Sequence, residues 1–363
     1  MSETLKELHA SLGAAFTVVN DQPAVAHYGD WRAEHAALWT SVGVLDLSCR
    51  SRLCLLGTDR VKFLHGQVTN EVNQLPLRRG CYAFLVNAKG RIQSDLNIHR
   101  LENELLLDFE PGMTAAVTQR LDQYIIADDV QIVDVAPHYG LLSAQGPRAR
   151  EVLMRLGLKL DLPAPEMAVA HTKLPEGGDV YVIQQPRLRT AGFDLHVPAA
   201  SLGMVFGKLV AAAKQAGGRA CGWQALETAR IEAGVPRFGQ DMDETHLAPE
   251  AGVTDRAISY SKGCYIGQEV IARVRTYGQV TRELRGLRLA DDLPALPARG
   301  DKLLKDGKEV GHVTSAVHSP RFHAPIALGY VRKETNAPGS QIQLQTKAGL
   351  VPVTVVSLPW APA

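Results

Sequence analysis

The first 280 residues alternate short apolar runs with amphipathic segments, a pattern that predicts strands and helices in succession. Residues 52–56 are typical of a strand, and Asp59 is the expected N-cap of the helix that follows. Residues 82–86 and 91–99 predict a hairpin, because the Asn-Ala-Lys-Gly segment between them tolerates the positive φ of a tight turn. A further strand is expected at 105–109 and a further helix at 113–124.

A second unit of the same kind follows in the chain. Residues 141–144 predict a strand and residues 148–156 a helix, with Pro147 near its favoured first-turn position. Another apolar stripe at helical spacing runs over 202–210. The recurrence of strand, glycine and helix is consistent with an internal duplication. Strands and helices mixed in this way predict an α+β fold.

The pattern changes after residue 281. Residues 290–300 are rich in proline and predict a linker or a long loop. Beyond them lie short apolar runs separated by turn residues, at 302–304, 311–315, 327–331, 341–345 and 351–356. Several short strands with turn signals predict a small antiparallel barrel or sandwich. We therefore expect one region over 1–280 and a C-terminal β domain over 281–363.

Composition narrows the class of protein. A chain of 363 residues is longer than one ordinary core, which predicts two or three domains. The formal net charge of +1 gives no global attraction for nucleic acid or a membrane surface, so an anionic ligand needs a local cluster. The N-terminus shows no signal-peptide pattern and no apolar run is long enough to span a bilayer. We expect a cytoplasmic protein with neither nucleic acid nor membrane among its partners.

The cysteines point to a reduced compartment. They are five in number and scattered, without a Cys-x-x-Cys pair, which argues against a disulfide framework and against a structural metal site. Cys264 lies in the segment KGCYIGQE, ahead of a helical apolar pattern. Amides at a helix start favour a thiolate, and Lys262 adds positive charge. The alternative is that Cys264 is a small buried hydrophobic residue, as most free cysteines are.

The segment KGCYIGQEVIARVRTYG resembles the signature of the YgfZ-type folate-binding proteins, which belong to the glycine cleavage T-protein (aminomethyltransferase) superfamily. The upstream run RIEAGVP, with PEAG at 249–252, is similar to the same superfamily, and residues 311–331 resemble its terminal barrel. The resemblance implies two ferredoxin-like α/β subdomains and a C-terminal antiparallel β-barrel around a central folate cavity. It also implies tetrahydrofolate, or a one-carbon derivative, as cofactor.

Residues 91–99 alternate in a way that places Asp95 on a polar strand face. This face is either exposed to solvent or lines a cavity that holds a polar heterocycle such as a pterin. The resemblance favours the second alternative, because Gly90–Asp95 is similar to the superfamily segment whose aspartate lies beside the reactive folate nitrogens. Ser94 stands where aminomethyltransferases usually carry the first of two aspartates.

Four more residues are candidates for the cofactor site. The Thr-Gly-Glu loop of the aminomethyltransferases is shortened here, and Asp194 is the candidate to replace its glutamate. Arg230 matches an arginine of the folate pocket, with a surface ion pair to a neighbouring glutamate as the alternative. Lys262 and Gln268 flank Cys264 and complete the predicted set.

Three functions remain open at this point. The first is a folate-dependent factor that supports assembly or repair of iron–sulfur clusters, with Cys264 as reactive thiol beside Asp95 and with iron–sulfur client proteins as partners. The second is an aminomethyltransferase or related one-carbon transferase, in which Asp95 stabilises charge on a folate nitrogen. True aminomethyltransferases typically show a Phe-Ile-Gly-Lys-like segment where this chain has its cysteine motif. The third is a non-catalytic scaffold that binds folate and a protein partner.

Overall fold

The computed structural model describes residues 3–175, 177–278, 280–293, 295–347 and 349–360. The chain forms two compact units. Unit 1 comprises Met1–Ala83 and Leu96–Ala229, and unit 2 comprises Phe84–Asp95 and Arg230–Ala363. The predicted domain boundary at residue 281 falls one residue before the first barrel strand, whereas the two compact units divide the C-terminal half of the chain at residue 230.

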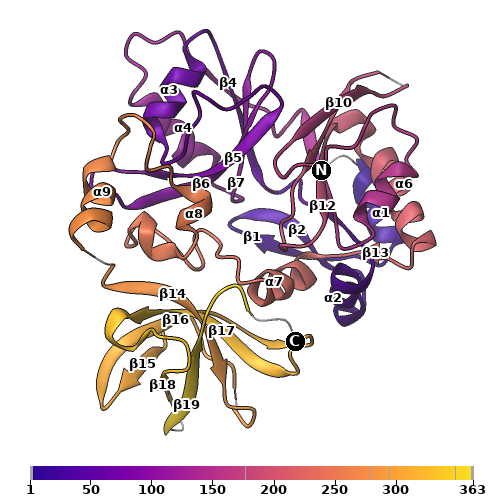
Figure 1. Cartoon of the computed structure of the whole chain (residues 1–363). Coiled ribbons are helices and arrows are strands. Elements are labelled where there is room, and N and C mark those ends of the chain that lie inside the picture. Colours follow the sequence, from indigo (N-terminus) through magenta and orange to yellow (C-terminus); the bar gives the residue numbers. More distant parts are fainter. Residues whose placement is uncertain (1–2, 176, 279, 294, 348, 361–363) are drawn as a thin grey trace. The chain divides into compact units, whose positions relative to one another are not determined.

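Unit 1 contains a six-stranded sheet with the strand order β10-β11-β12-β9-β3-β13. All its neighbouring strands are antiparallel except β13 and β3. Their bounds are β3 Gly43–Asp46, β9 Tyr139–Gln145, β10 Val169–Lys173, β11 Asp179–Gln184, β12 Gly192–Pro198 and β13 Arg219–Ala220. A two-stranded sheet pairs β1 (Ala15–Val19) with β2 (Gln22–His27). Figure 1 shows these strands with the helices that flank them.

A five-stranded sheet has the order β5-β6-β7-β4-β8. Its strands are β4 Ser51–Leu56, β5 Arg79–Val86, β6 Ile92–Arg100, β7 Leu105–Phe109 and β8 Gln131–Asp134. Two strands, β4 and β7, and the hairpin of β5 and β6 were predicted from the sequence, and the structure confirms them. The hairpin turn has the expected positive φ, which is +69° at Gly90. The side-chain oxygen of Asn87 accepts hydrogen bonds from the backbone amides of Lys89 and Arg91.

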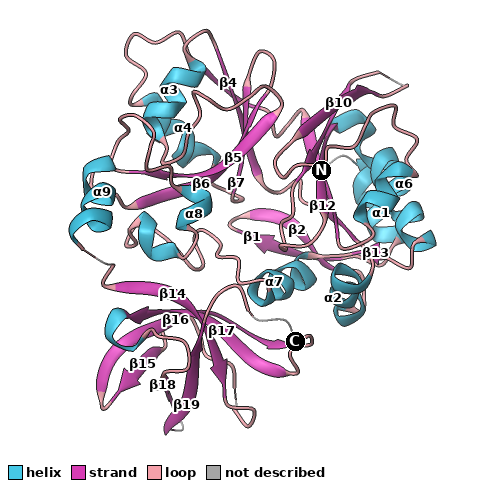
Figure 2. Cartoon of the chain, in the orientation of Figure 1, coloured by secondary structure: helices cyan, strands magenta, loops and turns pink. Residues whose placement is uncertain are grey.

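The first seven helices are interspersed with these strands along the chain, and Figure 2 distinguishes helices from strands by colour. They are α1 Glu3–Ser11, α2 Trp31–Thr40, α3 Arg60–Gln67, α4 Thr114–Asp122, α5 Ala149–Met154, α6 Leu202–Gln215 and α7 Trp223–Glu232. The structure confirms Asp59 as the N-cap of α3 but gives its side chain another partner. Asp59 stands at the N-cap of α3, but its carboxylate makes no capping bond and accepts the amide of Asp129 at 2.9 Å instead.

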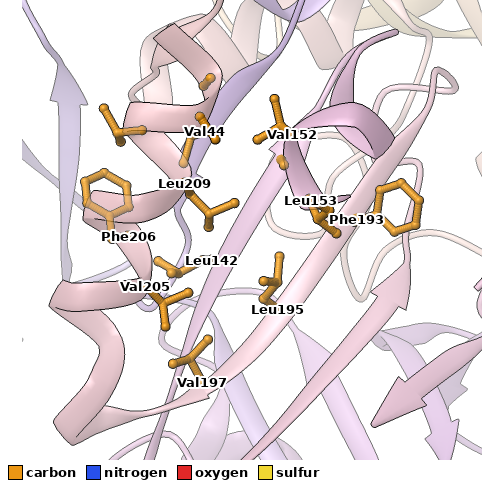
Figure 3. Packing of buried hydrophobic residues seen from close by; sticks show 14 of the residues in the cluster. Val44, Leu142, Val152, Leu153, Phe193, Leu195, Val197, Val205, Phe206 and Leu209 are labelled. Carbon is orange, nitrogen blue, oxygen red and sulfur yellow. The ribbon is translucent and has the colours of Figure 1, made fainter. Parts of the chain in front are cut away.

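The largest apolar core of unit 1 lies between α5, α6 and the six-stranded sheet (Figure 3). Leu202, Val205, Phe206 and Leu209 project from one face of α6 at the predicted helical spacing, and each is at most 4% exposed. They meet Leu142 and Leu195 from the sheet. Burying a side chain of this size contributes about 1.5–3 kcal/mol, so this stripe is what fixes α6 on the sheet.

Unit 2 is built on a closed antiparallel barrel with the order β14-β17-β16-β15-β18-β19. Its strands are β14 Arg282–Leu289, β15 Lys302–Lys305, β16 Lys308–Ser319, β17 Ala324–Arg332, β18 Gln341–Thr346 and β19 Gly349–Val356. The predicted α+β class with a C-terminal antiparallel β-barrel is therefore confirmed. The described parts of the proline-rich segment, 290–293 and 295–300, lie between barrel strands β14 and β15 in the chain and do not precede the first barrel strand; residue 294 lies outside the described residues.

Two helices precede the barrel in unit 2, α8 (Thr254–Ala257) and α9 (Gln268–Tyr277), together with a short 3-10 helix at Ala248–Ala251. Further 3-10 turns occur at Ala199–Ser201 in unit 1 and Lys333–Thr335 in unit 2. Over the residues that the structure describes, none of the helices combines the length and the apolar character needed to cross a membrane.

Candidate functional site

Cys264 lies on a loop just before α9, separated from its N-cap Gly267 by two residues. Its side chain is exposed, whereas Cys54 and Cys221 are buried and Cys49 and Cys81 are partly buried. Of the five cysteines, all of which the structure describes, Cys264 alone is exposed. The alternative of a small buried hydrophobic residue is therefore wrong for Cys264.

The loop that carries Cys264 is held against the β5–β6 hairpin turn through Gly267. This glycine has φ of +83°, and a Cβ added to it would lie 2.5 Å from the Asn87 carbonyl oxygen and 3.2 Å from the Gly90 amide nitrogen. Gly90 in turn lies against Val270 of α9. Glycine is needed at position 267 both for its backbone conformation and for this close approach.

Replacing Gly267 with alanine is expected to lower the free energy of unfolding by about 1–3 kcal/mol, because alanine is strained at this φ and its methyl group meets the hairpin backbone. Urea denaturation measures this loss. Gly278→Ala is the matched control at the other end of α9, since Gly278 has φ of −143° and its nearest neighbour would be 3.9 Å from the new Cβ. Equal stability losses in the two variants would contradict the role of Gly267 in holding the loop against the hairpin turn.

The residues that flank Cys264 differ in burial. Lys262 is 6% exposed, and its ammonium lies 4.7 Å from the ring centroid of Tyr265. Gln268 is the first residue of α9 and is half-buried. The structure confirms the prediction that Cys264 lies just before the start of a helix. The buried Lys262 holds the loop through its cation–π contact with Tyr265.

The polar face of β6 is not a solvent-exposed face. Asp95 is half-buried, and further along the strand Asn97 and His99 are 7% and 2% exposed. The opposite face, with Ser94 among its residues, is fully buried. Both faces of the strand are therefore at least partly buried, and the solvent-exposed alternative is wrong for Asn97 and His99. Asp95 belongs to unit 2, and Asn97 and His99 belong to unit 1.

Arg230 has a different partner from the one its sequence position indicated. It is 5% exposed at the end of α7, and its guanidinium donates to Asp241, to the Val235 carbonyl and to the Ser315 hydroxyl. The carboxylate of Asp241 also accepts from Ser315 at 2.6 Å and from Thr314 at 2.5 Å. The surface ion pair with a neighbouring glutamate is therefore wrong: Arg230 belongs to a buried cluster of unit 2 that includes Asp241 and two residues of strand β16.

Asp194 lies in unit 1 and is 3% exposed. Its carboxylate accepts two bonds from Arg187, at 3.0 Å from Nε and 2.6 Å from Nη2. Arg187 also donates to Asp108 at 2.8 Å, and Arg50 donates to the other oxygen of Asp108 at 2.7 Å. A buried network of two arginines and two aspartates thus spans the two large sheets of unit 1.

Two amide side chains extend the network. Asn97 donates to Asp108 at 3.0 Å, and Gln185 donates to the oxygen of Asn97 at 3.1 Å. The remaining oxygen of Gln185 is buried and accepts no hydrogen bond from the part of the chain that the structure describes. A buried acceptor of this kind is costly unless a ligand or solvent supplies a donor.

The pKa values of the two carboxyl groups in this network are shifted in opposite directions. Burial alone would raise the pKa of Asp108, but Arg50 and Arg187 outweigh it and hold the pKa well below its usual range. Burial raises the pKa of Asp194 despite its contact with Arg187, and the charge of Asp108 adds to that rise. Burial also lowers the pKa of His99 to about 4, so its ring is neutral at pH 7.

Asp108 and Arg187 were not predicted as site residues. Asp108 interrupts the apolar strand 105–109, and a charged residue in an otherwise buried strand is a signal that sequence reasoning could have used. Arg187 lies in a loop and carries no such signal. Among the described residues, no group of three or more His, Cys, Asp or Glu side chains could hold a metal ion.

These features define an α+β protein with two large sheets and a two-stranded sheet, a closed barrel in unit 2, and an exposed cysteine on a loop held in place through Gly267. The family model described as the GCVT N-terminal domain matches residues 5–262. The glycine cleavage T-protein C-terminal barrel domain matches residues 282–361. The chain therefore belongs to the glycine cleavage T-protein family.

Its relatives include an aminomethyltransferase of Saccharopolyspora erythraea, 28% identical over 359 residues that cover 98% of this chain and 96% of the relative. An aminomethyltransferase of Symbiobacterium thermophilum is 27% identical over 372 residues and covers 99% of this chain and 98% of the relative. The crystal structure of glycine cleavage system aminomethyltransferase T from Bartonella henselae has a TM-score of 0.88 at 23% identity, over 99% of this chain and 97% of that one. At this identity the structural match shows the fold alone.

Proposed function

We propose that the chain binds tetrahydrofolate, or a one-carbon derivative of it, as the predicted family relationship implies. The donor and acceptor set of unit 1 fits a pterin, whose ring edge both donates and accepts hydrogen bonds. Asn97, Asp108 and Gln185 present amide and carboxylate groups, and the buried oxygen of Gln185 accepts no bond from the described residues. When bound, the folate supplies a carrier for a one-carbon unit.

Within this proposal Asp95 keeps its predicted role of holding the reactive edge of the folate. Asp194, Arg230, Lys262 and Gln268 remain proposed contributors to the cofactor site. The ion pairs of Asp194 and Arg230 support an indirect contribution, in which each orders its neighbours rather than donating to the ligand itself. The covered polar face of β6 supports the role of Asp95.

We infer that the protein uses bound folate together with the reactive thiol of Cys264. In this proposal the thiol chemistry supports iron–sulfur cluster assembly or repair. The observation that carries this inference is the exposure of Cys264 on a loop fixed by Gly267, within a motif that resembles that of the YgfZ-type proteins. A reactive thiol must be accessible to its reaction partner, and a fixed loop keeps it in one place.

The second candidate is aminomethyl transfer, and the named relatives favour it. Each is called an aminomethyltransferase and is matched over nearly its whole length. In this candidate Asp95 stabilises charge on a folate nitrogen and Cys264 has no role in the reaction. Ser94 and the shortened loop before Asp194 count against it, because both replace residues that aminomethyltransferases usually carry.

A titration with tetrahydrofolate tests the shared part of both candidates. We expect the wild type to be stabilised by about 2.7 kcal/mol at a free ligand concentration one hundred times the Kd. Asp95→Ala is expected to lose most of this stabilisation, and Cys264→Ser to keep it. Thermal unfolding with and without ligand gives the readout. Absence of a shift in the wild type at saturating ligand would remove the folate proposal.

A glycine-cleavage assay with the lipoyl carrier protein separates the two uses of the folate. The thiol function predicts little turnover in this assay and loss of cellular iron–sulfur enzyme activity in Cys264→Ser. Robust turnover that is unchanged in Cys264→Ser would establish the second candidate in its place. If Cys264→Ala restores cellular activity while Asp95→Ala does not, the non-catalytic scaffold is the correct function.

A further inference from the structure

The two large sheets of unit 1 leave a pocket between them that the folate proposal does not use. Strand pairing aligns Cys54 with Leu106 in one sheet and Tyr181 with His196 in the other. All four residues line the pocket, together with Leu101, Glu104, Val135 and Tyr139. Two residues along the same strands lie the paired residues Arg52 and Asp108 in one sheet and Asp194 in the other. The pocket therefore lies beside the buried ion-pair network.

The pocket is small. It offers about 70 Å³ to the centres of water-sized atoms. One bound water needs at least about 10–15 Å³ by this measure, so the space suits roughly five such atoms. Its apolar side is formed by Leu101 and Leu106, which belong to one buried cluster with Cys54. A compact ligand with an apolar surface therefore fits its walls.

Two tyrosine rings and a carboxylate give the pocket its electrostatic character. The ring centroids of Tyr139 and Tyr181 are 6.4 Å apart at an interplanar angle of 54°, and Glu104 lies beside them on the lining. Burial, with a contribution from Glu104, raises the pKa of Tyr181 to about 12, and burial with nearby Asp179 and Glu104 raises that of Tyr139. Both phenols are therefore neutral and experience negative charge from their surroundings.

His196 supplies an unsatisfied acceptor in the same pocket. It is 2% exposed, and its Nδ1 atom is buried without a hydrogen-bond partner among the residues that the structure describes. Burial, helped by the charge of Arg52, lowers the pKa of His196 to about 3, so the ring is neutral at pH 7. A neutral imidazole presents a lone pair to a ligand and adds no positive charge.

Arg52 is the cation that opposes a positively charged ligand most directly. Its guanidinium donates to four backbone carbonyl oxygens, of Arg50, Ser48, Ala136 and Tyr139. Arg52 pairs with Asp108 across the β4–β7 ladder, and its charge contributes to the lowered pKa of His196. The lining side chains include a carboxylate and no lysine or arginine.

We propose that this pocket binds a small organic cation, a quaternary ammonium or a protonated alkylamine of about five heavy atoms. The tyrosine rings contact its alkyl groups through cation–π attraction, and Glu104 balances its charge. His196 accepts a hydrogen bond where the cation carries an N–H group. This site is separate from the proposed folate contacts and does not depend on them.

Isothermal titration with tetramethylammonium, against tert-butyl alcohol as a neutral molecule with the same number of heavy atoms, tests the proposal. We expect tetramethylammonium to bind the wild type at least about tenfold more tightly than the alcohol. Equal affinity would overturn the proposal and leave an apolar cavity. Absence of tetramethylammonium binding up to tens of millimolar would overturn it as well.

Two conservative variants locate the site. Glu104→Gln is expected to weaken tetramethylammonium about tenfold and to leave the alcohol unchanged, because only the charge is removed. Tyr181→Phe keeps the ring and is expected to bind normally, whereas Tyr181→Leu loses the preference for the cation. Folding of each variant is checked by its thermal transition. Full binding to a folded Glu104→Gln variant would place the cation elsewhere and refute the assignment.

Discussion

Replacing Arg187 with methionine is expected to lower the free energy of unfolding by about 3–5 kcal/mol. The substitution leaves Asp108 and Asp194, which are 2% and 3% exposed, without the cation that bonds to both. Removal of one member of a buried ion pair strands the other charge in a medium that solvates it poorly. Urea denaturation of the whole chain measures the loss.

Two further variants show whether the loss comes from stranded charge. Arg155→Met removes an exposed arginine that bonds to Glu151 at 2.7 Å and is expected to leave stability nearly unchanged. Arg187→Met combined with Asp194→Leu is expected to recover part of the loss, because the carboxyl group that pairs with Arg187 is gone while Asp108 keeps its bond to Arg50. If the double variant is less stable than Arg187→Met alone, stranded charge is not the cause.

Local patterns in the sequence predicted much of the fold. The α6 stripe over 202–210 and the hairpin around Asn87 and Gly90 depend on residues within one turn or one strand of each other. Barrel strands were found for the same reason, since short apolar runs between turn residues need no partner to be recognised. The resemblance to the T-protein superfamily then supplied the closure of those strands into a barrel.

The polar network could not be predicted in this way. Asp108 lies on β7 and Arg187 lies in the loop between β11 and β12, 79 residues further along the chain, so no local pattern connects them. Asp59 shows the same limit of local patterns, because the backbone amide that donates to its carboxylate belongs to the distant residue Asp129. Alternation in 91–99 defined two strand faces correctly but gave no information on what covers the polar one.

The partner of Arg230 leads to the second large expected effect. Arg230→Met and Asp241→Ala are each expected to lower the free energy of unfolding by about 3–5 kcal/mol. Asp241 is 0% exposed and Arg230 is 5% exposed, so either substitution leaves the other charge buried. The hydroxyls of Thr314 and Ser315 also lose an acceptor in Asp241→Ala. Chemical denaturation of both variants gives the comparison.

Tetrahydrofolate affinity then distinguishes the two roles of Arg230. A purely structural arginine predicts the same affinity in the folded fraction of both variants, whereas a direct folate contact predicts weaker binding in Arg230→Met alone. Arg299→Met, which removes an exposed ion pair with Asp243, is the control and is expected to change stability by at most about 1 kcal/mol. A stability loss in Asp241→Ala no larger than that of the control would show that the buried cluster of Arg230 and Asp241 does not stabilise the fold.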